Sequence, residues 1–364
     1  MAVSWIPKIS VSSKQLSKKM IAIQLVIVFL LGFFFVSTLD LSVYRSGLVD
    51  DCPTGWTLCR SSKPEPQSDV DIASLLHQQQ PIVPITRPKT FPYTIVTASS
   101  ANHLCSLENF LYSLNELRAE LEPSEFPRVV VYNIGMNRTQ LPVLDQLVEH
   151  GLIDDLVTFD YFKYPRFWDV ALNAGEYAWK TGIVNEARLH YTEDTDTGIL
   201  VWLDAGNLVT ADFLRHIPSI VRQHDGFWSP RSSYRMGRWT HPGMFDYYGV
   251  RASEYAKNVN CNGAAVGFDA RNQTIVDTMI IPWYECGLNK RCIAPPGSSR
   301  KNHRQDQAAL TFLAYRNGHS CKLVPNRFHN LQIHRDVSCR ANLLELEVQG
   351  KLNHPSSIGK YFFF

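Results

Sequence analysis

From about residue 91 onward, short apolar runs alternate along the chain with segments of helical period. The runs are rich in β-branched and aliphatic side chains, as in YTIVTA at residues 93–98, and are typical of buried strands. The intervening segments repeat apolar residues every three or four positions, as Leu107, Leu111 and Leu114 do. The pattern predicts strands at residues 93–98, 128–133, 156–160, 198–204 and 226–228, and helices at residues 105–117, 140–150 and 169–188. This alternation predicts an α/β domain with a mainly parallel mixed sheet, covered on both faces.

Residues 20–39 (MIAIQLVIVFLLGFFFVSTL) carry no charge, and as a helix they are long enough to span about 30 Å of hydrocarbon. Lysines precede this run and acidic residues follow it, so the positive-inside rule keeps the preceding residues 1–19 in the cytoplasm. A cleavable signal peptide is the alternative, but its apolar core is usually roughly 7–15 residues long. We therefore expect a cytoplasmic tail, one transmembrane signal anchor and a single-pass type II membrane protein.

Residues 40–90 are rich in Ser, Pro, Gln and Asp, which is typical of a stem that holds a folded domain away from the bilayer. Residues 91–364 then form the expected luminal domain, which is large enough for one substantial core. Asn137 and Asn272 each begin an N-x-T tripeptide, the acceptor for N-glycosylation in the secretory pathway. A short stem behind a single anchor favours the Golgi membrane.

The eight cysteines are an even number and form no C-x-x-C, which favours disulfides in an oxidising lumen over a structural zinc site. Cys286 and Cys292 are close enough in the chain to predict a local disulfide, as are Cys52 and Cys59. The sequence leaves open how the others pair, namely Cys105, Cys261, Cys321 and Cys339.

The charge of the chain argues against a nucleic-acid partner. The formal net charge is only +2, and no clustered basic excess follows the apolar run, whereas a nucleic-acid binder needs such a cluster to neutralise phosphates. The sequence also contains neither G-x-x-x-x-G-K-[ST] nor G-x-G-x-x-G. This argues against a P-loop nucleotide enzyme and against a dinucleotide dehydrogenase.

The most informative segment is GILVWLDAGN at residues 198–207, an apolar strand that ends in Asp204. Parallel sheets bind ligands at the carboxyl ends of their strands, although such a carboxylate can also simply cap a turn. Residues 260–268 join an Asn-Gly turn to a strand of small residues, and residues 303–310 open a helix with a polar cluster. The structural alternatives for these two segments are a hairpin turn and a helix N-cap.

In this order, the three segments resemble the motifs h-h-h-D-x-D, N-x-G-h and D-Q of the GT-A nucleotide-sugar glycosyltransferases. The chain is most similar to the retaining enzymes of the glycogenin and galactosyltransferase type. It also resembles an uncharacterised eukaryotic family of nucleotide-diphospho-sugar transferases, over about residues 91–335. The resemblance implies a single GT-A-like (Rossmann-like) domain. It also implies an enzyme that transfers a sugar from a nucleotide-sugar donor to a glycan or glycoprotein acceptor.

The resemblance assigns roles to residues by their positions in the motifs. Asp204 takes the place of the first aspartate of D-x-D, which binds the donor and a divalent cation, Mn²⁺ or Mg²⁺. A late histidine completes the metal site in such enzymes, and His334 or the less well placed His329 is the candidate here. Asn262 and Gly263 are expected to line the cleft between donor and acceptor.

Further candidates concern the transfer itself. Asp306 and Gln307 are expected near the transferred sugar, and Glu285 and Asp306 are candidate general bases if the enzyme inverts configuration. Arg231 and Arg235 lie in a long polar segment after residue 228. They are candidate donor-binding residues because a departing nucleoside diphosphate needs positive charge, although a solvated loop is the alternative.

The chain departs from the family's pattern at the metal site. Asp204-Ala-Gly206 lacks the second aspartate, and Asn207 offers the donor only a neutral oxygen one position later. A hard cation gains from paired carboxylates, so the sequence predicts weak metal binding or none. Two other functions therefore stay open: a non-catalytic carbohydrate-binding or scaffold protein on the same fold, and a hydrolase, which would need a carboxylate pair at a sugar cleft.

Overall fold

The computed structural model describes residues 90–352. The predicted cytoplasmic tail, transmembrane anchor, Cys52–Cys59 pair and almost all of the predicted stem lie outside the described residues. Within residues 90–352, no helix combines the length and the apolar character that crossing a membrane requires.

The core of the fold is a six-stranded sheet with the order β3-β2-β1-β4-β8-β5. In sheet order its strands are β3 (Asp155–Thr158), β2 (Arg128–Asn133), β1 (Thr94–Ser99), β4 (Ile199–Leu203), β8 (Ala265–Asp269) and β5 (Phe227–Trp228). Pairing is parallel from β3 to β4, and β8 is antiparallel to both of its neighbours. The predicted α/β class and mainly parallel sheet are thus confirmed.

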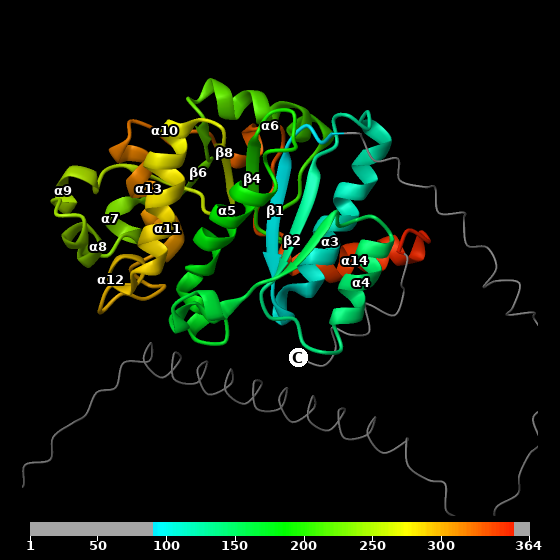
Figure 1. Ribbon diagram of the computed structural model, residues 1–364, viewed down its shortest axis with the longest axis horizontal. Coiled ribbons are helices and arrows are strands. Elements are labelled where there is room, and N and C mark those ends of the chain that lie inside the picture. The colour runs from blue at the N-terminus through cyan, green and yellow to red at the C-terminus, as the bar shows by residue number, and fades with distance from the viewer. Residues whose placement is uncertain (1–89, 353–364) are drawn as a thin grey trace, which may run out of the picture. The chain divides into compact units, whose positions relative to one another are not determined.

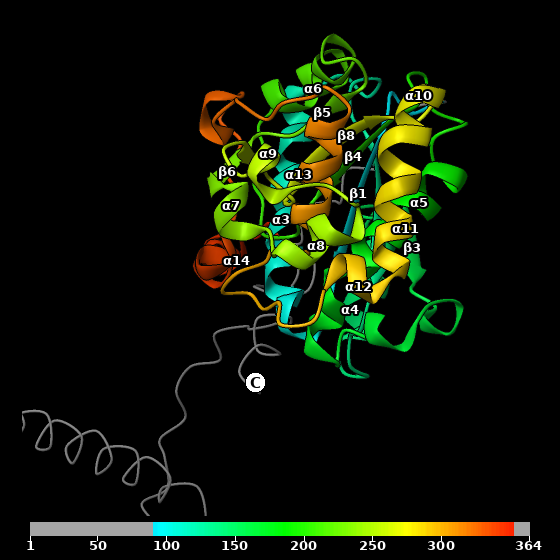
Figure 2. The ribbon, with the colours of Figure 1, turned by 90° about the vertical axis from the view of Figure 1, so that its left-hand side faces the viewer.

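Both faces of this sheet are buried. Neighbouring residues of a strand point to opposite sides, so Ile95 belongs to one hydrophobic cluster and Val96 to the other. One face is covered by α3 (Leu104–Glu116), α4 (Leu141–Glu149), α6 (Ala211–Gln223) and α14 (Cys339–Val348). The other is covered by α5 (Trp179–His190), α11 (Ile281–Leu288) and α13 (Gln305–Arg316), and Figure 1 shows these helices on the side opposite α3, α4 and α14. Figure 2 shows α11 and α13 lying in front of the sheet.

The segment after residue 228, expected as a loop, contains short elements. A two-stranded sheet pairs β6 (Arg231–Arg235) with β7 (Val259–Cys261). The remaining short helices are α7 (Met236–Trp239), α8 (Pro242–Tyr247), α9 (Ala252–Tyr255), α10 (Gln273–Ile275) and α12 (Lys290–Ile293). A π-helical stretch, Val276–Ile280, joins α10 to α11.

The helix predicted at residues 169–188 is wrong in its first half, because α5 begins only at Trp179. Residues Asn173–Tyr177 instead form a left-handed turn with φ between 48° and 61°. Gly175 lies so close to the preceding chain that a β-carbon would be 2.1 Å from the Trp168 carbonyl oxygen. Packing against the buried Trp168 determines the conformation of this turn. The local spacing of apolar residues does not indicate such a contact.

The structure forms three disulfides, Cys286–Cys292, Cys105–Cys339 and Cys261–Cys321. The first confirms the local pair that the sequence predicts. The other two join residues 234 and 60 positions apart in the chain, a separation at which spacing says nothing about pairing.

Both predicted N-glycosylation acceptors lie in turns with partly exposed side chains. Asn137 Oδ1 accepts hydrogen bonds from the Thr139 backbone N–H and hydroxyl, and Asn272 caps the amino end of α10. The tripeptides are therefore at the surface, and their glycosylation stays a prediction.

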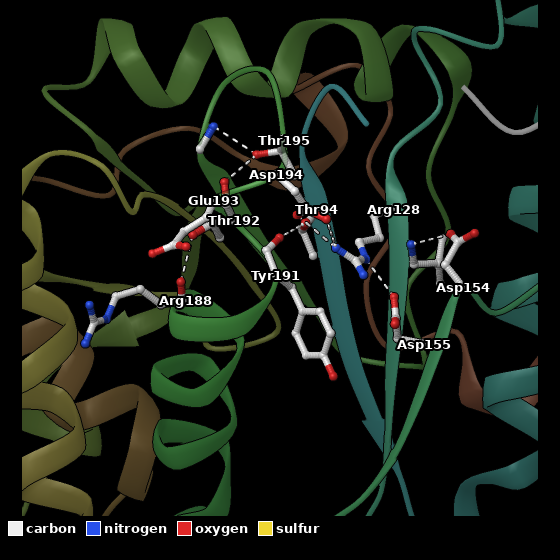
Figure 3. A network of polar contacts seen from close by, with 12 residues as sticks. Thr94, Arg128, Asp154, Asp155, Arg188, Tyr191, Thr192, Glu193, Asp194 and Thr195 are labelled. Atoms are coloured by element: carbon white, nitrogen blue, oxygen red, sulfur yellow. Dashed lines mark hydrogen bonds and ion pairs between the residues drawn. The ribbon is translucent and has the colours of Figure 1, made fainter. Parts of the chain in front are cut away.

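At the amino ends of β1 and β2, Arg128 joins three segments of the chain (Figure 3). Its Nε lies 2.6 Å from Asp155 Oδ2 and its Nη1 lies 2.8 Å from Asp194 Oδ2. Nearby, the Thr94 hydroxyl donates a hydrogen bond to the Tyr191 carbonyl. This network ties together the strand ends opposite those that carry Asp204.

Candidate functional site

Strands β2 and β3 lie on one side of β1, whereas β4, the next strand along the chain, lies on its other side. The carboxyl ends of β1 and β4 therefore flank a topological switch point. A cavity of about 610 Å³, the larger cavity, opens at these ends. Its walls include residues 98–103 after β1 and residues 204–206 after β4. Asp204 thus lies where α/β sheets of this kind bind ligands.

A second cavity of about 300 Å³, the smaller cavity, adjoins the first. It is lined by the turn after β7, the start of α13 and two serines of β6. Both cavities share the residues Tyr177, Lys180, Asp204, Arg300 and His334. The two cavities therefore form one cleft that meets at Asp204.

A buried lysine occupies the centre of this cleft. Lys180 Nζ lies 2.9 Å from Asp204 Oδ1 and 3.0 Å from Asp306 Oδ2. It also donates a hydrogen bond to the Gly263 carbonyl at 3.0 Å. The side chains of Lys180 and Asp306 are 5% and 6% exposed, whereas that of Asp204 is 33% exposed. One ammonium thus joins the D-x-D, N-x-G and D-Q segments.

The charge of Lys180 is stable in this position. Burial by itself lowers the pKa of the ammonium, but the charges of Asp204 and Asp306 and their hydrogen bonds outweigh it and raise the pKa above its usual value. One cation between two carboxylates still leaves negative charge in excess. An anionic ligand in the cleft would therefore require further positive charge from the walls or from a bound cation.

The protein holds only one oxygen of Asp204. Oδ1 accepts hydrogen bonds from Lys180 Nζ and, at 2.7 Å, from Trp202 Nε1. Oδ2 has no hydrogen-bond partner among residues 90–352. Asp204 is thereby oriented, with its second oxygen left for a ligand.

The N-x-G and D-Q segments fit together because one residue is glycine. A β-carbon at Gly263 would lie 3.1 Å from Asp306 Oδ2 and 3.2 Å from Gln307 Cβ, closer than ordinary contact. Asn262 Oδ1 accepts a hydrogen bond inside the turn, and Trp283 Nε1 donates to the Asp306 carbonyl at 2.9 Å. Gly263 therefore allows the start of α13 to lie directly against the turn.

The structure brings most of the motif residues together. Those that line the smaller cavity are Asp204, Asn262, Gly263, Asp306, Gln307 and His334. They come from positions spread over 130 residues of the chain, so the three motifs meet in one cavity, and the roles assigned to their residues stay predictions.

Four predicted site residues lie elsewhere. Arg231 and Arg235 are exposed on β6 and line neither cavity, and the Arg235 guanidinium donates to a backbone carbonyl. Glu285 is exposed on α11, also outside both cavities. Asn207 is fully buried, and its Nδ2 donates to the Ala264 carbonyl at 2.6 Å, so it joins two turns instead of facing a donor.

Two arginines of the cleft were not among the predicted site residues. The Arg300 guanidinium lies 4.5 Å from the Tyr177 ring centroid, and that of Arg304 lies 4.2 Å from the Trp239 ring centroid. Burial, together with the positive charge of Arg300, lowers the pKa of Arg304. Two neighbouring guanidinium groups that repel one another are a favourable setting for an anion.

Lys180 was not among the predicted site residues either, although the sequence does indicate that it is buried. It lies at helical spacing from Ile183, Val184 and Ala187, all of which are buried. A lysine on the apolar face of a helix requires a buried partner of opposite charge. This signal says that Lys180 has such a partner, but not which one.

The alternative metal-ligand candidate, His329, lies outside the cleft. It belongs to a surface cluster with Asp212 and His216, in which its Nδ1 contacts Asp212 Oδ2 and its ring stacks on His216 with centroids 4.4 Å apart. Among the described residues, this is the only group of three potential ligand atoms already within 4.8 Å of one another. Of the two histidines, His334 is the one that lines both cavities.

Three side chains of the types that bind hard divalent cations line the larger cavity, but their ligand atoms do not all lie within 4.8 Å of one another. Asp204, His334 and Asp336 all line the larger cavity, and Mn²⁺ and Mg²⁺ accept carboxylate and imidazole ligands together with phosphate oxygens. Asp336 does not belong to any of the three sequence motifs.

No protein-family model matches this sequence, and no curated protein sequence does. The fold is similar to that of several solved structures. The bifunctional glycosyltransferase WbbM is 12% identical with a TM-score of 0.44, and the match covers 76% of this chain and 52% of that one. The mannosyltransferase PcManGT from Pyrobaculum calidifontis, solved with GDP-Man and Mn²⁺, is 17% identical with a TM-score of 0.38 and coverages of 73% and 63%. Mouse xyloside xylosyltransferase 1 is 11% identical with a TM-score of 0.36 and coverages of 64% and 85%.

This chain thus spans about half the length of WbbM and less than two thirds of PcManGT. All three are glycosyltransferases by name.

Proposed function

We propose that this protein is a glycosyltransferase that moves a sugar from a nucleotide-sugar donor to a glycan or glycoprotein acceptor in the Golgi lumen. The observation that carries the proposal is the position of Lys180, which bridges Asp204 and Asp306 where the two cavities meet. Two adjoining cavities with ionic groups at their junction fit a donor in which a diphosphate joins a nucleoside to a sugar.

The larger cavity suits the nucleoside. Its volume of about 610 Å³ is in the range typical of small-molecule sites. Ala98, Ile134 and Val170 supply apolar wall, while Tyr177 and Trp179 supply aromatic surface. Bases stack well on such surfaces, and the position at the switch point is where α/β sheets bind nucleotides.

The junction of the cavities suits the diphosphate. Arg300 and His334 lie at this junction, and Arg300 provides charge-assisted hydrogen bonds for phosphate oxygens. A bound Mn²⁺ or Mg²⁺ supplies further positive charge that stabilises the departing diphosphate. Lys180 is fully engaged with protein acceptors, so its task is to orient Asp204 and Asp306.

The smaller cavity suits the sugar. Asn262, Asp306 and Gln307 offer hydrogen-bonding groups for hydroxyls, and the Trp239 ring offers a flat apolar face. As the bond from the anomeric carbon to the diphosphate breaks, positive charge develops on the sugar, and the Asp306 carboxylate stabilises it. A new bond then forms to the acceptor hydroxyl oxygen.

The geometry favours retention of the anomeric configuration. Of the two candidate general bases, Glu285 lies outside the cleft, and Asp306 is engaged with Lys180 and almost buried. Without a free base, the departing diphosphate accepts the proton of the acceptor hydroxyl. NMR of the product distinguishes retention from inversion.

A panel of UDP- and GDP-sugars tests the proposal with the full-length chain purified in detergent. We expect nucleotide release and sugar transfer with at least one donor, and loss of both in Asp306→Asn. Arg231→Ala is the matched control, because that arginine lies outside the cleft. Donor binding without turnover would favour the non-catalytic carbohydrate-binding protein. Sugar released from an oligosaccharide without any nucleotide would favour the hydrolase.

The luminal orientation is part of the proposal and has its own test. The predicted anchor at residues 20–39 and the surface position of Asn137 and Asn272 support it. We expect Asn137→Gln and Asn272→Gln each to remove one glycosidase-sensitive band in expressing cells, and the fluorescently tagged chain to co-localise with a Golgi marker. Unchanged migration after glycosidase treatment would contradict the luminal orientation.

A further inference from the structure

Position 206 of the Asp204-Ala-Gly206 motif has no side chain, yet the space beside it is filled. A β-carbon at Gly206 would lie 2.4 Å from both carboxylate oxygens of Asp336 and 2.6 Å from its Cγ. Real β-carbons essentially never make contacts this short, so a side chain at position 206 would have to displace the Asp336 carboxylate. The carboxylate of Asp336 therefore occupies the room that an aspartate at position 206 would need.

A backbone ladder brings Asp336 to this place. The segment before it runs antiparallel to the chain that follows β4, with Leu208 and Gln332 exchanging hydrogen bonds of 2.8 and 2.9 Å. The Arg335 N–H then donates to the Gly206 carbonyl at 2.6 Å. The main chain of this segment is thus paired with the main chain of the motif itself.

Two contacts hold the other side of the segment on α3. The Ser106 hydroxyl donates to Asp336 Oδ1 at 2.7 Å, and the adjacent Cys105 forms a disulfide with Cys339. Oδ2 of Asp336 has no hydrogen-bond partner in the described part of the chain. Asp336 thus repeats the arrangement of Asp204, in which one oxygen is held by the protein and the other is left for a ligand.

We propose that Asp336 supplies the carboxylate that position 206 lacks, and that it forms a divalent-cation site with Asp204 and His334. The proposal rests on the proposed function, in which the larger cavity holds a nucleoside diphosphate. The three side chains line that cavity from two segments paired through their backbones. In this structure the three donor atoms do not all lie within 4.8 Å of one another, so the side chains would have to approach one another to hold the cation, with phosphate oxygens as further ligands. The motif is thus divided between two segments that are far apart in the sequence.

Binding of Mn²⁺ alone tests the site. The full-length chain in detergent is titrated with Mn²⁺, and free Mn²⁺ is followed by its electron paramagnetic resonance signal. All variants carry His329→Ala, which removes the surface cluster as a competing site. We expect Asp336→Asn and Asp204→Asn each to weaken Mn²⁺ binding about tenfold or more. Asp246→Asn, in an acid that lines neither cavity, is the matched control and should leave binding unchanged.

An exchange of positions sharpens the test. Gly206→Asp alone displaces the Asp336 carboxylate and breaks its hydrogen bond with the Ser106 hydroxyl, so we expect a lower Tm. The double variant Gly206→Asp/Asp336→Gly moves the carboxylate back into the motif, and we expect it to regain both Tm and most of the Mn²⁺ affinity. Wild-type affinity in Asp336→Asn, or a stable double variant that does not bind Mn²⁺, would overturn the proposal.

The outcomes separate this inference from the proposed function. Donor turnover that continues while Asp336→Asn leaves Mn²⁺ binding unchanged would refute the role of Asp336 and leave the transferase standing. Mn²⁺ binding that depends on Asp204 and Asp336, in a chain that binds no nucleotide sugar, would support the cation site and refute the transferase.

Discussion

The two cavities meet at Asp204 but are built in different ways. The larger cavity is formed in part by the chain at the carboxyl ends of β1 and β4, so its position follows from parallel-sheet topology. The smaller cavity depends on a turn, the first turn of α13 and a buried ion pair between Lys180 and Asp306. The first therefore depends on regular backbone geometry and the second on charged side chains that must find one another. Substitutions in the larger cavity should therefore affect nucleotide binding, and substitutions in the smaller cavity should affect sugar transfer.

The largest effect is expected from Lys180→Met, which leaves two carboxylates at the junction without their cation. Breaking a buried ion pair from one side costs about 3–5 kcal/mol, so the free energy of unfolding should fall by about this amount. Denaturant unfolding followed by tryptophan fluorescence measures it. Lys180→Met/Asp306→Asn removes the almost buried carboxylate as well and should regain part of the loss. An unchanged midpoint in Lys180→Met would contradict the role of the bridge.

Asp306→Asn should damage the smaller cavity alone. The carboxylate is replaced by a neutral group of the same shape, so we expect kcat to fall about 100-fold or more while the Kd of the free nucleotide is retained. Steady-state kinetics and nucleotide titration measure the two quantities. Equal losses in kcat and in nucleotide affinity would contradict the assignment of the sugar to the smaller cavity and the nucleoside to the larger one.

Protonation of His303, beside the smaller cavity, should make the free energy of unfolding depend on pH. His303, just before α13, is buried, its Nε2 donates to the Ile293 carbonyl, and burial lowers its pKa to about 4. The unfolded chain, with a pKa of about 6.5, binds the proton first as pH falls, so stability is lost between pH 6.5 and 4. From pH 7 to 5 this group should lower the free energy of unfolding by about 2 kcal/mol.

Denaturant unfolding at several pH values measures this slope in the wild type and in His303→Gln. The variant replaces the imidazole by an amide that does not titrate, so its slope should be smaller by the contribution of His303. Identical slopes would show that the buried imidazole is not the group responsible.

Ala101→Trp should damage the larger cavity alone. Ala101 lines that cavity but not the smaller one, so an indole there takes up room needed by the nucleoside. We expect the nucleotide Kd to rise about tenfold, equivalent to about 1.4 kcal/mol, with little change in kcat at saturating donor. A kcat that falls with an unchanged Kd would reverse the assignment of the two cavities.

An effect of similar size is expected from a comparison of two exposed arginines. Arg300 lies at the junction of the cavities and Arg231 lies outside both. Losing a charge-assisted hydrogen bond to phosphate should raise the donor KM about tenfold in Arg300→Ala, and Arg231→Ala should leave it unchanged. Equal effects would show that Arg300 acts only through the overall field.

The strands and the motif residues were predictable because each depends on a few neighbouring residues. Residues 128–133 form β2 as expected, and Asp204 follows β4 as the apolar run implies. The left-handed turn at Asn173–Tyr177 was not predictable, since its spacing is helical and only contact with Trp168 forms the turn. Lys180 was missed for a related reason: helical periodicity marks it as buried but does not name its partners.

The sequence by itself determined the order of strands and helices, an apolar span at residues 20–39 and the carboxylate at the end of β4. These are local properties, set by the alternation of side chains along a few residues. Only the tertiary structure decided that Lys180 joins Asp204 to Asp306 and that Asp336 fills the space beside Gly206. Ion pairs and steric exclusion act over a few ångströms between residues that lie 24 to 130 positions apart in the chain, and no local pattern encodes those distances.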